Sequence, residues 1–207
     1  GVKNIRAAIM KPCEDALSEA EKIAETERRP IKTVCEEGEV YERIVGIAEA
    51  ENCGIIVMGR RSKSRFERSL IGSVTARVIG HSQRDVLIVP EGTAIGWKNI
   101  LLTTDGSRYS EAAADKAIDF AKSYGGELKV ISVVDVPSEY YAEAPKAVED
   151  LIKKAKGFVG NLKEKAEASN ISTETFVGEG DAYKVITDLA KKEKADVIFM
   201  GSHGRTG

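Results

Sequence analysis

Residues 37–59 read EGEVYERIVGIAEAENCGIIVMG, and residues 179–201 read EGDAYKVITDLAKKEKADVIFMG. The two stretches lie 142 residues apart (179 − 37), align without a gap and are identical at nine of 23 positions. Each leads from a helical pattern into an apolar run that ends in Met-Gly. Solenoid units repeat at about 20–50 residues, so a spacing this long indicates a duplicated domain instead.

The second copy alternates apolar runs with helical patterns. In the first helical pattern, Ala113, Ala117, Phe120 and Ala121 recur at helical spacing, and Ser107 stands before it as an N-cap. The apolar runs predict strands at 99–104, 128–134, 171–177 and 195–200, and helices are predicted at 108–124, 147–168 and 181–194.

The first copy enters the same pattern at a later point. Its elements are predicted as helices at 14–27, 40–51 and 73–80 and as strands at 31–35, 54–58 and 86–89. By the repeat offset, the first copy lacks an opening strand-helix-strand of about 44 residues, and the second lacks its last helix and strand, about 25 residues.

Solidly apolar strands that alternate with helices are typical of parallel sheets covered on both faces. We therefore predict an α/β chain with two repeated doubly wound domains, each built on a parallel five-stranded sheet. The first domain is expected at residues 1–95 and the second at 98–207.

Composition limits the function classes. The net charge of −2 gives no basic excess for nucleic acid, and no apolar run is long enough for a transmembrane helix. No signal peptide is visible, which predicts a cytoplasmic protein. Cys13, Cys35 and Cys53 are therefore expected to be free thiols, and with only His81 and His203 available a zinc site is not expected.

A candidate site lies where two strands of the second copy end. Asp105 follows the first strand, and Gly201-Ser202-His203-Gly204 follows the fourth. In a doubly wound sheet these ends flank one crevice, where a carboxylate can bind ribose hydroxyls or a metal and glycines admit phosphate to the backbone. The alternative is structural: Asp105 and Ser107 cap a helix, and the glycines only turn the chain.

Other site classes are not supported. The chain contains no G-x-x-x-x-G-K-[ST] and no G-x-G-x-x-G, and the two histidines suggest no catalytic triad. Basic residues are dense at 60–68 in the first copy. We interpret this segment as a solvated loop, with phosphate contact and polyanion binding as alternatives.

These motifs together resemble the universal stress protein family in its tandem form. The family's nucleotide motif, G-x2-G-x9-G-[ST], is matched in copy two by Gly201-x2-Gly204 and in copy one by Gly59-x2-Ser62-x9-Gly72-Ser73. Ser62 stands where the second glycine belongs. The segments Thr103-Thr104-Asp105-Gly106-Ser107 and Gly178-x-Gly180-Asp181 also resemble family signatures.

The resemblance implies binding of ATP or AMP, mainly by the second repeat because of Ser62, with Asp105 in possible indirect contact with Mg. It also implies pairing of repeats through the strand Val86-Leu87-Ile88-Val89, within the chain or in a homodimer. The implied nucleotide-binding residues are Asp105, Val133, Met200, Gly201, His203 and Gly204 in copy two and Met58, Gly59, Gly72 and Ser73 in copy one.

The expected function is a nucleotide-responsive stress or signalling module rather than a fast enzyme. Nucleotide would order the loop at 201–207 and thereby change a partner surface. The alternatives are a dimerising interaction module that needs no nucleotide and a slow ATPase.

Overall fold

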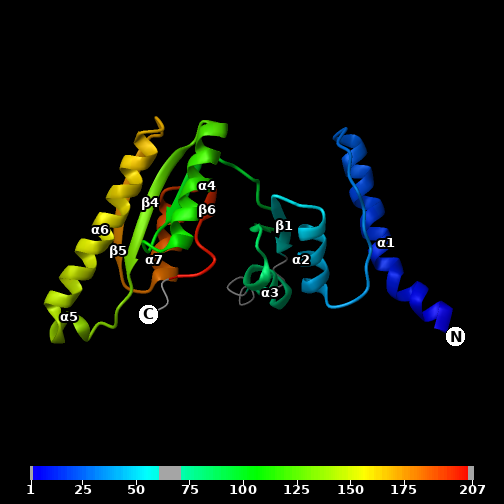
Figure 1. The fold of residues 1–207 in the computed structure, drawn as a ribbon, viewed down its shortest axis with the longest axis horizontal. Helices are drawn as coiled ribbons and strands as arrows, with labels where there is room; N and C mark the ends of the chain where they lie inside the picture. Colours follow the sequence, from blue (N-terminus) through cyan, green and yellow to red (C-terminus); the bar gives the residue numbers. More distant parts are fainter. Residues whose placement is uncertain (1, 61–70, 205–207) are drawn as a thin grey trace. The chain divides into compact units, whose positions relative to one another are not determined.

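The computed structural model describes residues 2–60 and 71–204. The chain divides into two compact units, Gly1–Glu91 and Gly92–Gly207 (Figure 1). Within the described ranges, no helix is long and apolar enough to cross a membrane.

The second unit is built on a four-stranded parallel sheet in the order β5-β4-β3-β6. The two central strands are almost wholly buried, which explains their unbroken apolar sequence. The strands are β3 (Asn99–Thr103), β4 (Glu127–Val134), β5 (Thr173–Glu179) and β6 (Val197–Phe199).

Helices cover both faces of this sheet. Side chains of α4 (Arg108–Tyr124) and α6 (Pro145–Glu167) form the main core with one face, which includes Leu102 and Val130. Successive side chains alternate across a strand, so Ile131 lies on the other face, and there Val185 of α7 (Ala182–Lys192) packs close to Gly178. The short α5 (Tyr140–Glu143) precedes α6. The predicted α/β class with parallel sheets is confirmed.

Local sequence signals set the ends of these helices. The Ser107 hydroxyl accepts the Ser110 amide at 3.2 Å, and the Asp181 carboxylate accepts the Lys184 amide at 3.2 Å. Gly125 ends α4 with a φ of 62°, a conformation that costs glycine little. The N-cap predicted at Ser107 is confirmed.

A polar cluster ties the strands together at the amino end of the sheet. Lys129, the third residue of β4, is 5% exposed, and its Nζ donates to Asn99 Oδ1 at 3.1 Å and to Glu127 Oε1 at 2.7 Å. The Asp196 carboxylate accepts the amides of Lys98 and Asn99, which fixes the entry to β6 against β3.

The first unit contains a smaller parallel sheet, in which β1 (Ile55–Arg60) pairs with β2 (Asp85–Pro90). Its core is formed by Ala48, Ile56 and Val78. The helices are α1 (Val2–Thr26), α2 (Val40–Ala50) and α3 (Ser73–His81).

Two predictions for the first unit are wrong. The helix expected at 14–27 begins at Val2 and includes Pro12, and residues 31–35 form no strand. In the second unit the equivalent β5 hydrogen-bonds only to β4. The described part of the first unit has no strand equivalent to β4, so residues 31–35 have no neighbour with which to form a ladder. The two sheets therefore have four and two strands in the described residues, against five in the predicted complete repeat.

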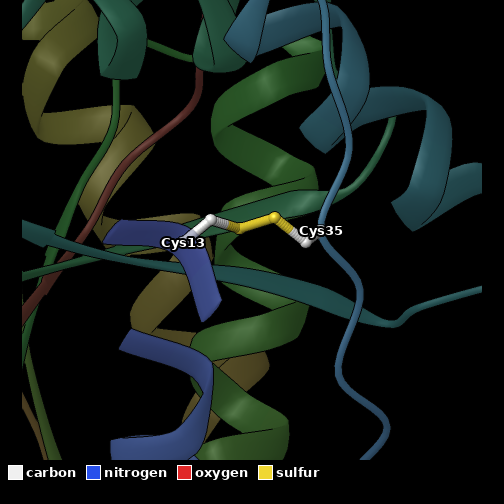
Figure 2. Close-up of a disulfide and its surroundings, with 2 residues drawn as sticks. All are labelled: Cys13 and Cys35. Carbon is white, nitrogen blue, oxygen red and sulfur yellow. A yellow bond between two sulfur atoms is a disulfide. The ribbon is translucent and has the colours of Figure 1, made fainter. Parts of the chain in front are cut away.

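The prediction of free thiols is also wrong for two of the three cysteines. Cys13 of α1 and Cys35 of the extended segment form a disulfide with a Cα–Cα distance of 6.3 Å (Figure 2), and Cys53 is free. At the 142-residue offset, Cys13 corresponds to Ala155 of α6 and Cys35 to Val177 of β5. The disulfide therefore joins a helix and a segment whose equivalents pack together in the second unit.

Backbone geometry repeats at the same offset. Residues with positive φ occur in three pairs that lie 142 positions apart: Arg28 with Asn170, Gly38 with Gly180, and Asn52 with Lys194. The two members of a pair occupy equivalent places in their copies. Arg28 and Asn170 each follow a long helix, and Asn52 and Lys194 each follow the helix that leads to the Met-Gly strand. This agreement fits the predicted duplication.

Candidate functional site

The candidate site lies at the carboxyl edge of the second unit's sheet. Asp105 follows β3 by two residues, Val133 is the penultimate residue of β4, and Met200 follows β6 directly. Because β3 lies between β4 and β6 and all three run in parallel, the three positions share one edge of the sheet. The structure thus brings together segments that lie almost 100 residues apart in sequence.

Hydrogen bonds hold the Asp105 carboxylate in place. Asp105 Oδ1 accepts the Ser107 amide at 2.9 Å, and Thr104 Oγ1 accepts the Gly106 amide at 3.2 Å. Gly106 has a φ of 73° and lies directly against the ring of Phe158, so a side chain has neither the backbone conformation nor the space. Asp105 therefore holds the turn before α4, while the helix cap itself is Ser107.

The glycine loop, residues 201–204, lies over this turn. A Cβ added to Gly204 would be 3.4 Å from Asp105 Oδ2, and one added to Gly201 would be 2.9 Å from the backbone of Tyr109. Glycine is required at 201 because the two backbones approach so closely. The loop thus brings backbone groups next to a carboxylate, the arrangement expected of a site for a ribose and its phosphates.

The remaining predicted residues of copy two line the same edge. Val133 is partly buried and pairs in register with Gly178 of β5. Met200 is 58% exposed, and His203 is exposed.

Sequence reasoning missed Arg108 and Tyr109, which form the first turn of α4. The Arg108 guanidinium carbon lies 4.7 Å from the centroid of the Tyr109 ring, and the His203 ring lies 5.0 Å from the same ring. The hydrogen bond to Tyr109 raises the pKa of Arg108. Their position directly after the Asp105 turn was the available signal, but the contact with His203 is visible only in three dimensions.

A tyrosine contact lies at the end of the outer strand. Tyr141 of α5 donates a hydrogen bond to Glu179, the last residue of β5, and this bond raises the pKa of Tyr141. Nearby, Asp135 Oδ2 accepts the Ala182 amide at 3.1 Å and so connects the end of β4 to the start of α7.

Copy one presents a more open arrangement. Met58 and Gly59 lie in β1, Gly72 precedes α3 without a side-chain cap, and Ser73 lines a cavity of about 170 Å³ with Glu39 and Arg77. Among the described residues, none would lie within 4 Å of a Cβ added to Gly59, in contrast to the equivalent Gly201. Ser62 and the basic segment from residue 61 onward lie outside the described residues.

Among the described side chains, no group of three or more His, Cys, Asp and Glu could hold a metal ion. Asp105 is the acidic side chain beside the glycine loop. A divalent metal here would therefore need further oxygen ligands from a bound phosphate chain.

Comparison with known proteins gives a consistent result. Residues 5–90 and 96–207 both match the model of the universal stress protein family. Universal stress protein MJ0531 of Methanocaldococcus jannaschii is 36% identical over an alignment of 118 residues that covers 54% of this chain and 68% of the relative. Universal stress protein Sll1654 of Synechocystis sp. is 31% identical over an alignment of 119 residues that covers 55% of this chain and 71% of the relative.

A solved structure shares the fold. The structure of a universal stress protein from Archaeoglobus fulgidus aligns with all of this chain and 71% of its own, with a TM-score of 0.75 at 23% identity. The resemblance in the motifs is therefore confirmed by the family match and by the fold.

Proposed function

Because the chain belongs to the universal stress protein family, we propose that its second repeat binds an adenine nucleotide, ATP or AMP. The observation that supports this most directly is the approach of Gly204 to Asp105, at 3.4 Å from Oδ2 to a Cβ built on the glycine. The first-strand signature that contains Asp105 and the nucleotide motif that contains Gly204 are 99 residues apart (204 − 105) in sequence and lie together at one edge of the sheet.

Each residue has a proposed role. Asp105 would accept hydrogen bonds from the ribose hydroxyls, and Val133 would lie against the adenine. Met200, Gly201, His203 and Gly204 would surround the phosphates, with backbone N–H groups as donors. A bound Mg ion would neutralise the phosphate chain, and Asp105 would contact it through water.

Binding is assigned mainly to the second repeat. Gly201 packs on the first turn of α4, whereas a Cβ added to Gly59 of copy one would meet no described residue within 4 Å. Met58, Gly59, Gly72 and Ser73 of copy one would then form a weaker site or none, since Ser62 replaces the motif's second glycine.

The bound nucleotide is proposed to act as a signal rather than as the substrate of a fast enzyme. The carboxylate beside the glycine loop, Asp105, already accepts the Ser107 amide, which makes it a poor general base. Nucleotide would instead favour one arrangement of the glycine loop and alter the surface offered to a protein partner. Equal protease sensitivity of this loop with and without saturating ATP would contradict the idea.

The experiment is mass spectrometry of the nucleotide released from purified, heat-denatured protein. We expect close to one ATP or AMP per chain, lost in Asp105→Ala and retained in Asp119→Ala, a matched change of an exposed carboxylate on α4, the helix that follows the Asp105 turn. Two nucleotides per chain would assign binding to both repeats. No nucleotide, together with no thermal shift on addition of Mg-ATP, would favour the nucleotide-independent dimerising module.

We also propose that repeats pair through β2, within the chain or in a homodimer. In the described residues β2 hydrogen-bonds only to β1, so one edge of the strand has no partner strand. Pairing on both edges predicts slow hydrogen exchange at every amide from 86 to 89. Rapid exchange at alternate amides would contradict it.

The repeats are assigned to residues 1–95 and 98–207 of a cytoplasmic protein. Limited proteolysis should then cut first between the repeats, near residues 91–98, and release two protected fragments. Cleavage that begins within either repeat would contradict these boundaries.

A further inference from the structure

Resting on the proposed function, we infer that Arg108 binds the phosphate chain of the nucleotide and that Tyr109 is a positioning residue for His203. The site would thereby select nucleoside polyphosphates over adenosine.

The Tyr109 ring links the helix to the glycine loop. Arg108 Nη2 donates to Tyr109 Oη at 2.8 Å, and its guanidinium carbon lies 4.7 Å from the ring centroid. The His203 ring lies 5.0 Å from the same ring at an interplanar angle of 40°. Ser202 Oγ is 3.0 Å from His203 Nδ1, so the imidazole is held from a second side.

Within the fold, the charge of Arg108 serves a cation–π contact with the Tyr109 ring. A cation in the first turn of a helix lies at the positive end of the helix dipole, which is unfavourable, and Glu111 is the acidic residue that shares this turn. Among the described residues, Arg108 forms no ion pair with a carboxylate. An anion bound here would remove this unfavourable charge arrangement.

The glycine loop brings the phosphates to this cation. Gly204 lies beside Asp105, and Gly201 lies on the backbone of Tyr109. The loop therefore runs between the carboxylate proposed to bind ribose and the turn that carries Arg108. A phosphate chain bound to loop amides is within reach of an arginine side chain from this turn.

The first unit contains the same three residue types with the cation neutralised. The His81 and Tyr41 rings lie 5.0 Å apart, and the Arg77 guanidinium carbon lies 5.3 Å from the Tyr41 ring. There, however, Arg77 pairs with Glu39 at 3.3 Å. The two clusters therefore differ in one respect: Arg77 has a carboxylate partner, whereas Arg108 has none among the described residues.

Calorimetric titration of the full chain with ATP and with adenosine tests Arg108. In Arg108→Gln the affinity for ATP should fall about tenfold, the effect of one charge-assisted contact, while that for adenosine is unchanged. Arg77→Gln, the matched control, should bind both like the wild type. ATP affinity unchanged in Arg108→Gln, or an equal loss for adenosine, would overturn the inference while leaving nucleotide binding intact. A wild-type chain that binds neither ligand would overturn the proposed function itself.

Proton NMR tests Tyr109 without any ligand, since the sequence contains only two histidines. Tyr109→Leu should remove the ring-current shift of His203 and leave His81 unchanged, and Tyr41→Leu should do the reverse. Tyr109→Phe retains the ring and should restore the His203 shift together with most of the ATP affinity. A His203 resonance that does not move in Tyr109→Leu would overturn the positioning role.

Discussion

Gly201 lies so close to Tyr109 that a Cβ on the glycine would be 2.9 Å from both the carbonyl carbon and the Cβ of the tyrosine. The end of β6 and the first turn of α4 are therefore in backbone contact. Any change that moves one of these segments must move the other, which couples the glycine loop to the Asp105 turn.

This contact predicts the effect of adding one methyl group. Gly201→Ala should displace the loop, reduce nucleotide binding at least tenfold and lower the free energy of unfolding by about 1–3 kcal/mol through overpacking. The control is Gly157→Ala on the exposed side of α6, where a Cβ meets nothing within 4 Å. That change should raise stability by up to about 1 kcal/mol, because alanine favours the helix. Equal effects of the two substitutions in urea titrations would contradict the proposed contact.

The burial of Lys129 predicts that its substitution lowers the stability of the second unit, although it lies far from the candidate nucleotide site. Its side chain is 7% exposed and carries two hydrogen bonds at the amino end of the sheet. Lys129→Ala should destabilise the second unit by about 2–4 kcal/mol, since it leaves a cavity and removes a buried donor. Lys129→Met retains the apolar stem, so its cost should be smaller, about 1–2 kcal/mol.

Urea unfolding followed by fluorescence of Trp97, the single tryptophan, measures both variants in the unit that contains it. Lys122→Ala on the exposed surface of α4 is the control and should change stability by no more than about 0.5 kcal/mol. A Lys129→Ala variant as stable as this control would show that the buried cluster contributes nothing.

The disulfide predicts a local effect in the first unit. It joins residues that are 22 positions apart, and a loop of this length corresponds to about 3 kcal/mol of stabilisation through restriction of the unfolded chain. Reduction should free α1 from the segment at 29–37 and leave the urea unfolding transition of Trp97 unchanged.

Alkylation in denaturant tests whether the disulfide is present. It should label one cysteine without reductant and all three with it. Three labelled cysteines in the unreduced protein would show that the disulfide is absent.

The Tyr141–Glu179 contact predicts behaviour at alkaline pH. The hydrogen bond from the neutral phenol to the carboxylate raises the pKa of Tyr141 above its ordinary value of 10.0. The contact is therefore complete below pH 10 and is lost as the pH rises through the higher folded-state pKa. Tyr141→Phe should remove one late-ionising phenol from a tyrosinate absorbance titration.

Tyr140→Phe, which leaves the Glu179 contact in place, is the control. Tyr41 also has a raised pKa, through its hydrogen bond to Glu42, so one late component should remain in Tyr141→Phe. If Tyr141→Phe instead removed a tyrosine that ionises at the ordinary value, the contact with Glu179 would be excluded.

The sequence alone determined the elements whose signals are local. The helix at 108–124 was predicted at its observed bounds, because apolar spacing, the Ser107 cap and Gly125 all act within a few residues. The positions of Asp105 and of the glycine loop at strand ends followed from the same local patterns and from the order of a parallel sheet.

Tertiary structure decided everything that depends on a distant partner. Residues 31–35 have a strand-like sequence, yet form no strand, because a ladder needs a neighbour such as β4. Cys13 and Cys35 form a disulfide because the chain returns past α1, and spacing along the sequence does not reveal that approach. The contact of Tyr109 with His203 likewise exists only because β3 and β6 are adjacent, so that side chains 94 residues apart (203 − 109) meet at one edge of the sheet.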